Sequence, residues 1–155
     1  MEKKIIIEHL RTAKAAHIKW VQKAKLLING LDIEEGTIPV DSTECTFGKW
    51  FYGEGQVLNL LTHISPTLIQ NIEELHSQLH DEYLKIFNIF FNKAKAGFIC
   101  KLFGLKRKNV SDEEYKVSRG YFASLEKISK DLLEEINKLE KELVVVSEEE
   151  IQSLV

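Results

Sequence analysis

Hydrophobic residues recur along most of the chain at alternating steps of three and four, the spacing of one face of an α-helix. In a first segment, about 3–29, the stripe consists of Ile6, Leu10, Ala13, His17, Trp20, Ala24 and Leu27. Segments at about 66–96 and 111–143 repeat it with Ile69, Ile72, His76, Leu79, Tyr83, Ile86 and Phe90, and with Tyr115, Ser118, Phe122, Leu125, Ser129, Leu132, Ile136, Leu139 and Leu143. A shorter apolar run at 56–64 predicts a fourth helix. We therefore predict an all-α protein, an antiparallel four-helix bundle with a short Cys-bearing helical segment between helices.

Residues with special backbone or capping preferences mark the predicted helix ends. Gly30 is a typical stop after the first helix. Ser65 followed by Pro66 is a start signal for the next long helix. Ser111 with Glu114 three residues later predicts a capping box at the start of the last long helix.

A short helical turn is predicted around Cys45, with Asp41 or Ser42 as its cap. A thiol in the first turn of a helix lies near the positive end of the peptide dipoles, which favours the thiolate. Several aromatic residues follow directly, namely Phe47, Trp50, Phe51 and Tyr52. We expect them to form a packed cluster beside the sulfur.

Composition and charge narrow the class of protein. The chain has 155 residues, 44% of them hydrophobic, a net charge of −3 and only two prolines. We expect one bundle domain over 1–146 and a tail, 147–155, that forms a short helix. The acidic balance favours no nucleic-acid partner. No apolar run approaches the roughly 20 residues of a transmembrane segment, and charges interrupt the first residues, so we expect a cytoplasmic location without disulfides at Cys45 or Cys100.

Four residues form a candidate metal site. His17 and His76 lie on the core stripes of different helices, and His80 lies one turn beyond His76 on the same face. Together with Cys45 they make a complete ligand set for Zn²⁺, which prefers nitrogen and sulfur donors in a tetrahedron. Four protein ligands leave no position for a reactive water. We therefore expect a zinc site in a protein that is not an enzyme.

Two alternative classes stay open at this stage. An iron-binding protein of the hemerythrin-like or di-iron type also places histidines on core stripes, but it needs paired carboxylate ligands. Glu73 and His76 supply one Glu-x-x-His spacing, and the sequence has no second copy. The other alternative is a structural interaction module whose histidines are incidental. The remaining histidines lack a partner at ligand spacing: His9 is expected at the surface, and His63 is a reserve ligand.

The sequence resembles the CZB family, the chemoreceptor zinc-binding domain of bacterial chemoreceptors and diguanylate cyclases. The resemblance covers about residues 5–143 and rests on a His and a Trp in the first helix, a Cys-x-x-Gly-x-Trp segment and a His-x-x-x-His pair. These are His17 with Trp20, Cys45-Thr46-Phe47-Gly48-Lys49-Trp50, and His76 with His80. It implies a four-helix bundle that holds zinc through His17, Cys45, His76 and His80.

The resemblance also implies a regulatory function. Family members sense zinc, or oxidants such as hypochlorous acid that attack the ligating Cys, and pass the signal to an output domain. We therefore expect a zinc-binding sensory domain of bacterial signal transduction, of the chemotaxis or cyclic-di-GMP type. Methyl-accepting helices and a cyclase domain are not recognisable in the sequence, so the expected partner is a separate signalling protein. A homodimer fits both the family and the heptad pattern.

Two further segments each have two interpretations. The tail, 146–155, is similar to the acidic peptide with which flagellar switch proteins dock a chemotaxis response regulator; otherwise it is a frayed amphipathic helix end in which Ser147 and Glu150 make a capping box. The segment 97–110 combines apolar residues with a basic cluster. It either caps the end of the bundle or rests on an acidic membrane surface, and its Cys100 is either a buried residue or a second redox thiol.

Overall fold

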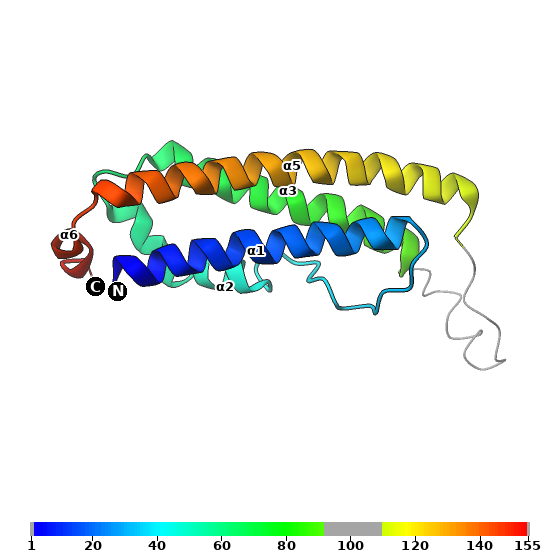
Figure 1. Ribbon diagram of the computed structural model, residues 1–155, viewed down its shortest axis with the longest axis horizontal. Coiled ribbons are helices and arrows are strands. Elements are labelled where there is room, and N and C mark those ends of the chain that lie inside the picture. Colours follow the sequence, from blue (N-terminus) through cyan, green and yellow to red (C-terminus); the bar gives the residue numbers. More distant parts are fainter. Residues whose placement is uncertain (1, 92–109, 155) are drawn as a thin grey trace.

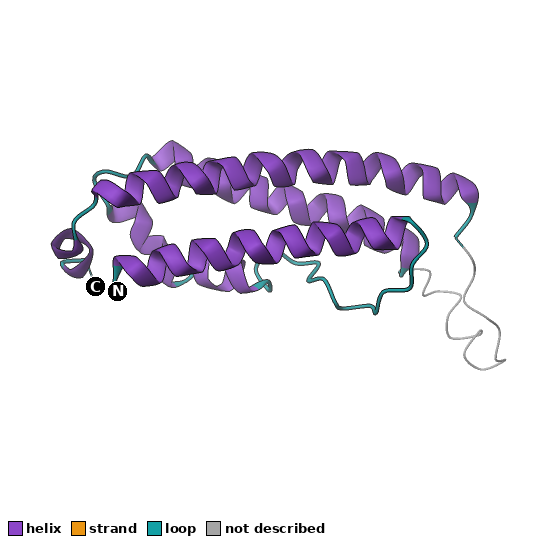
Figure 2. Ribbon diagram, viewed as in Figure 1, coloured by secondary structure: helices purple, strands orange, loops and turns teal. Residues whose placement is uncertain are grey.

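The computed structural model describes residues 2–91 and 110–154. Its elements are α1 (Lys3–Ile28), α2 (Thr46–Phe51), the 3₁₀ helix η1 (Glu54–Leu60), α3 (Pro66–Phe90), α5 (Asp112–Val145) and α6 (Glu148–Gln152). Every element of these described ranges is helical and none is a strand (Figure 2). The predicted all-α fold is confirmed.

The three long helices lie side by side in an elongated bundle. α1 and α3 run in the same direction, and α5, which packs against both of them, runs in the opposite direction (Figure 1). The chain returns from the end of α1 to the start of α3 through the 29–45 loop, α2 and η1, which run against α1. This discontinuous return segment takes the place that a continuous fourth helix has in a regular four-helix bundle.

The short helix predicted at 56–64 is instead the 3₁₀ helix at Glu54–Leu60. Within η1 the buried residues are Gly55, Val57 and Leu58, and Leu61 and Ile64 continue the steps of three from Gly55 and Leu58 beyond its end. Three residues per turn is the period of a 3₁₀ helix, and a run this short gains little from α-helical propagation. Tertiary packing therefore selects the tighter helix.

The predicted stripes form the core. All seven stripe residues of the first segment are buried on α1. On α3 and α5 the stripes are buried as well, except that Phe90 and Tyr115 are half-buried. These two rings meet edge to face, with centroids 5.5 Å apart, where α3 and α5 pair near their ends. The spacing of hydrophobic residues in the sequence therefore predicted which side of each long helix faces inward.

α1 ends as predicted at Gly30. Gly30 has a φ of +86°, in the left-handed region that glycine adopts without strain. The N–H of Gly30 donates to the carbonyl of Leu27 at 3.0 Å, and the N–H of Leu31 donates to that of Leu26 at 3.1 Å. This pair of bonds is the Schellman motif.

The starts of α5 and α3 differ in their capping. Ser111 and Glu114 form the predicted reciprocal capping box, with N–H to side-chain distances of 3.3 and 2.8 Å. Ser65 occupies the N-cap of α3 with Pro66 at the first helical position, yet its side chain makes no capping bond within the described residues. Its backbone N–H instead donates to Glu142 on α5 at 2.9 Å. The start of α3 is therefore tied to another helix.

The tail folds back as α6 against the end of the bundle where α1 begins (Figure 1). Ser147 accepts from the N–H of Glu150 at 3.0 Å, but the predicted reciprocal bond is replaced. The Glu150 carboxylate accepts instead from the N–H and hydroxyl of Thr62, at 3.0 and 2.9 Å. Ile151 is fully buried. The tail is thus part of the packed structure.

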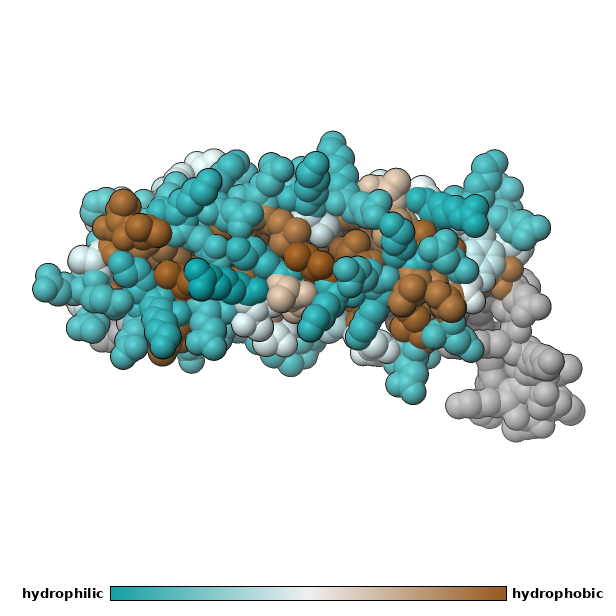
Figure 3. Space-filling model, in the orientation of Figure 1, coloured by the Kyte–Doolittle hydropathy of each residue, from teal (hydrophilic) through white to brown (hydrophobic). Residues whose placement is uncertain are grey.

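The face of the molecule that Figure 3 shows is mainly hydrophilic, with separate apolar areas among the hydrophilic side chains. None of the helices in the described ranges combines the length and apolar character that a membrane span requires. The two interpretations of 97–110 and of Cys100 concern residues that, apart from Val110, lie outside the described ranges.

Candidate metal centre

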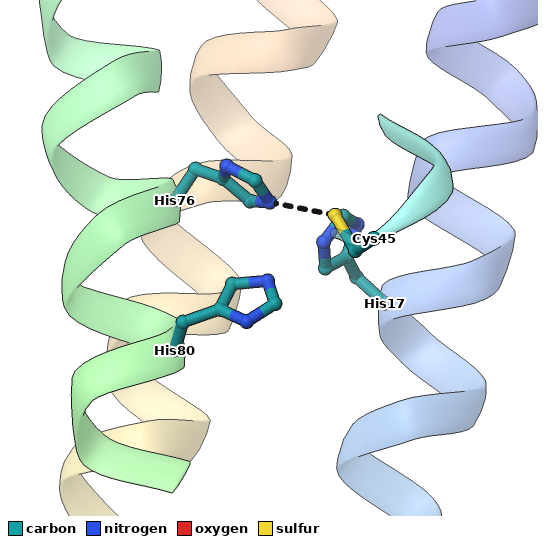
Figure 4. Close-up of side chains that lie close together, drawn as sticks. All are labelled: His17, Cys45, His76 and His80. Carbon is teal, nitrogen blue, oxygen red and sulfur yellow. Dashed lines mark hydrogen bonds between the residues drawn. The ribbon is translucent and has the colours of Figure 1, made fainter. Parts of the chain in front are cut away.

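Four side chains from three parts of the chain meet inside the bundle. One ligand atom from each of His17, Cys45, His76 and His80 lies within 4.8 Å of the others. His17 comes from α1, Cys45 from the start of α2, and the other two from α3 (Figure 4). All four residues are buried, with exposures of 8% or less. The structure therefore brings together the complete set of candidate ligands.

Backbone carbonyls orient two of the imidazole rings. Nδ1 of His17 lies 2.7 Å from the carbonyl oxygen of Ala13, and Nδ1 of His80 lies 3.0 Å from that of Val40. A carbonyl only accepts, so each Nδ1 must carry the proton, which leaves Nε2 with a free lone pair. Metal-bound histidines typically have such a partner on their other nitrogen. Both rings are thus held as Nε2 donors.

The orphaned nitrogens of the cluster also fit a metal. Nε2 of His80 is buried without a hydrogen-bond partner among the described residues. Nε2 of His76 lies 3.2 Å from Sγ of Cys45, and its Nδ1 is likewise buried without a described partner. A buried polar atom without a partner is costly, and coordination at Nε2 of His80 would remove this cost.

Cys45 is itself the N-cap of α2, so the prediction of Asp41 or Ser42 in this role is wrong. Its Sγ accepts from the N–H of Gly48 at 3.1 Å, and its thiol donates to the carbonyl of Ser42 at 3.4 Å. The Asp41 carboxylate instead accepts from the N–H and hydroxyl of Thr43, both at 2.8 Å. Asp41 therefore shapes the turn that precedes the cysteine.

Gly48 is required by a close approach of backbone to backbone. A Cβ atom at this position would lie 1.8 Å from the carbonyl oxygen of Ser42. Any side chain would therefore push apart the turn that presents Cys45. This explains in physical terms why the Cys-x-x-Gly spacing contains a glycine.

Burial keeps the metal-free cluster neutral. It lowers the pKa of His17 to about 4 and that of His76 to about 3, and it also lowers the pKa of His80. Neutral imidazoles are the form that binds metals. Burial raises the pKa of the Cys45 thiol and outweighs the N–H of Gly48, which lowers it. The predicted preference for the thiolate is therefore not met in the metal-free protein.

The dimensions of the cluster suit one zinc ion. Bonds of about 2.0–2.3 Å in a tetrahedron place neighbouring ligand atoms roughly 3.3–3.7 Å apart. The sulfur of Cys45 and Nε2 of His76 are already 3.2 Å apart, and no pair in the cluster exceeds 4.8 Å. The group contains one sulfur, three imidazoles and, within the described residues, no carboxylate. Such a set favours zinc over a di-iron centre.

Aromatic side chains surround the cluster and fix the rings. Phe47 meets His17 and His76 edge to face, with centroids 5.8 and 4.9 Å apart. Trp20 lies 4.5 Å from the ring of His80. The predicted aromatic cluster next to Cys45 is therefore present, and it restricts the rotamers of the donors.

A cleft of about 270 Å³ leads from the surface to the cluster. His17, Cys45 and His80 line it, together with Phe47 and other residues of α1 and the 37–39 loop. The sequence did not reveal this cleft or the orienting carbonyl of Val40, because a backbone carbonyl carries no sequence signal and the loop has no periodicity.

The other two histidines of the chain lie elsewhere in the described structure. His9, which was expected at the surface, is instead half-buried and stacks on Trp50, with centroids 4.8 Å apart and an angle of 10° between the planes. His63 lies 3.3 Å from the Glu150 carboxylate at the bundle end. Neither belongs to the cluster.

Fold and cluster together define a class: an all-helical bundle protein with a buried centre of three histidines and one cysteine. Sequence comparison gives a likeness to one family, since residues 17–87 match the model of the chemoreceptor zinc-binding domain, CZB. The match runs from α1 into α3 and contains all four residues of the cluster. Comparison with curated proteins and with solved structures gave no match. Zinc is the metal of this family, and the donor set fits it.

Proposed function

We propose that this protein is a zinc-dependent sensory domain of bacterial signalling in which His17, Cys45, His76 and His80 ligate one Zn²⁺. The observation that carries the proposal is the convergence of their ligand atoms within 4.8 Å, inside a segment that matches the CZB family. The donors would be Sγ of the cysteine, Nε2 of His17 and His80, whose Nδ1 atoms are held by backbone carbonyls, and Nε2 of His76, which already faces the sulfur at 3.2 Å.

The centre is proposed to regulate rather than to catalyse. Four protein donors complete the tetrahedron of a structural zinc site, and no position is left for a substrate or a reactive water. The ligands are drawn from α1, α2 and α3. The site would therefore fasten the short helix α2 to two long helices, and its loss would release α2.

Cys45 is the donor through which an oxidant would act. Zinc, when bound, keeps the Cys45 sulfur deprotonated at neutral pH. The sulfur is the only readily oxidised atom among the four donors, and conversion to a sulfenic acid weakens it as a ligand. The cleft beside Cys45 gives small molecules a route to it. Oxidation, like zinc release itself, would thus free the Cys45 segment from α1 and α3.

A separate signalling protein of a chemotaxis or cyclic-di-GMP pathway is proposed to read this change. A thiol that must stay reduced to bind zinc favours the cytoplasm, where thiols are kept reduced. A homodimer is compatible with the long helices. The tail is a less direct docking element, because Ile151 is buried and a partner would have to open the bundle end first.

Metal analysis of protein purified without a metal-affinity tag tests the proposal. We expect one zinc per chain in the wild type and less than a tenth of that in Cys45→Ser and His76→Ala. His63→Ala is the matched control, since His63 is exposed and lies outside the cluster. Two irons per chain, or no metal after growth in zinc-supplemented medium, would refute the zinc assignment.

Hydrogen exchange tests the proposed movement. Amides of α2 and η1 should exchange faster after zinc removal or stoichiometric oxidation, whereas those in the middle of α5, which contributes no ligand to the cluster, should change little. Equal protection of α2 in the zinc-bound and zinc-free protein would exclude this segment as the signalling element.

A further inference from the structure

The cleft that leads to Cys45 carries a one-sided charge. Its charged lining side chains, among the described residues, are Lys19 and Lys23, and no carboxylate lines it. The two lysines are four residues apart on α1, so they lie on one face, one turn from each other. Among the side chains that line the cleft in the described part of the chain, the two lysines therefore carry the formal charge.

These lysines are not neutralised by neighbours. Neither forms an ion pair within the described residues, whereas Lys14 and Lys25 on the same helix pair with Glu140 and Glu126 at 2.8 and 3.7 Å. Asp41 lies close enough to act on Cys45 and His80 and keeps its negative charge, because its hydrogen-bond donor Thr43 is neutral, but it is not part of the cleft lining. Glu44 pairs with Lys49 at 3.1 Å. Two lysines without an ion pair thus line the cleft, and one carboxylate lies outside its lining.

A positive entrance changes which oxidants reach the sulfur. When zinc is bound, one thiolate and three neutral imidazoles leave the centre with a net charge of +1, so it does not repel an anion. Two cations at the mouth of the cleft add to this positive potential and raise the local concentration of anions. A neutral oxidant gains nothing from them.

We propose that Lys19 and Lys23 form an entry site for small anionic oxidants and make Cys45 selective for them over neutral ones. This inference rests on the proposed function, in which Cys45 is the oxidised ligand. The two lysines act as specificity determinants and are not among the candidate metal ligands.

Peroxymonosulfate and hydrogen peroxide are the probes, because they carry the same O–O bond and differ in charge. The Cys45 thiolate attacks the terminal peroxo oxygen of HOOSO₃⁻; the S–O bond forms and the O–O bond breaks. Sulfate leaves with the bonding electron pair and the proton stays on the sulfenic acid. Sulfur is oxidised by two electrons and the peroxo group is reduced by two. Hydrogen peroxide reacts in the same way and releases hydroxide.

The rate of sulfenic acid formation at Cys45 is measured in the full-length, zinc-loaded protein by dimedone trapping and peptide mass spectrometry. In Lys19→Gln/Lys23→Gln, the rate with peroxymonosulfate should fall about 3- to 10-fold at low ionic strength, and the deficit should shrink at 0.5 M salt. The rate with hydrogen peroxide should stay within a factor of about two. Lys25→Gln removes a charge from the same helix away from the cleft, and it should react like the wild type.

The outcomes separate the two hypotheses. Equal loss of rate with both oxidants, or an equal loss in Lys25→Gln, would overturn the role of Lys19 and Lys23 while leaving Cys45 as the sensor. Failure of Cys45 to react with either oxidant in the wild type would refute redox sensing and the entry site with it. Zinc content and circular dichroism of each variant confirm that the rates refer to folded, loaded protein.

Discussion

Replacing Gly48 by alanine tests whether the backbone of the turn positions the cysteine. The added Cβ would lie 1.8 Å from the carbonyl oxygen of Ser42 and 2.9 Å from its carbonyl carbon. Both are backbone atoms, so no side chain can rotate away to relieve the contact. The turn between Ser42 and Cys45 must therefore move as a unit.

The size of the effect follows from these distances. Raising the contact with Ser42 from 1.8 Å to the 3.0 Å below which real Cβ contacts are essentially never seen requires a shift of about 1.2 Å. Ligand distances in metal sites tolerate about 0.2 Å. We therefore expect Gly48→Ala to lower zinc affinity by at least about 100-fold, or roughly 2.7 kcal/mol. The overpacking itself should destabilise the metal-free protein by about 1–3 kcal/mol.

Two assays measure these effects separately. Competition with a chelator of known affinity gives the zinc dissociation constant, and thermal unfolding in EDTA gives the stability of the metal-free form. In EDTA the midpoint should fall by roughly 2–12 °C. Gly120→Ala is the control: it lies inside α5 with no described atom within 4 Å of its added Cβ. It should raise stability by roughly 0.5–1 kcal/mol without a change in zinc affinity.

A Gly48→Ala protein that binds zinc as tightly as the wild type would refute the reasoning. It would mean that the turn can adapt by more than an ångström without moving the sulfur. The glycine would then serve another purpose, and Cys45 would be positioned by its contacts with the histidines.

Further predictions concern the ligands, the pH dependence and the bundle end. His80→Ala should reduce zinc affinity by more than about 100-fold in the same chelator competition, since even outer contacts of a metal site are worth about 10- to 100-fold; near-normal affinity would exclude it as a ligand. Because burial lowers the pKa of His17 to about 4 and of His76 to about 3 from 6.5, the unfolded chain binds more protons in this range. In EDTA, the free energy of unfolding by urea should therefore fall as pH drops from about 6.5 to 3. Its change with pH should be smaller in His76→Leu; an unchanged pH dependence would contradict a lowered pKa of His76 in the folded protein. Ile151→Ala should cost about 2–4 kcal/mol in the same urea titration because the side chain is fully buried, whereas Leu154→Ala, 36% exposed, should cost much less, and equal effects would argue against a packed α6.

The long helices and the cluster could be predicted because they depend on periodicity. A residue on the hydrophobic stripe of a helix faces inward even when it is itself polar. The inward position of His17 therefore followed from the spacing of Leu10, Ala13 and Trp20 on α1. His76 and His80 followed in the same way from their spacing on α3. The match to a Cys-x-x-Gly-x-Trp segment then connected the two helices to Cys45.

What the sequence did not show depends on contacts between distant segments. Glu150 has the spacing of a capping box, but its carboxylate binds Thr62, which lies 88 residues away in the chain. The protonation of Cys45 likewise depends on burial by other elements, which outweighs the local dipole expected from its place at a helix start. Local rules name the available partners, and tertiary structure decides which partner is used.

The sulfur of Cys45 serves two structures at once, because it faces His76 and also accepts the hydrogen bond that caps α2. A chemical change at this one atom removes a long-range anchor and a local stabiliser of about 1 kcal/mol in a single event. Helix α2 has only six residues and cannot persist on propensity, so its survival would then depend on the packing of Phe47, Trp50 and Phe51. In the proposed mechanism, the oxidation state of this one atom would decide whether the whole helix stays folded.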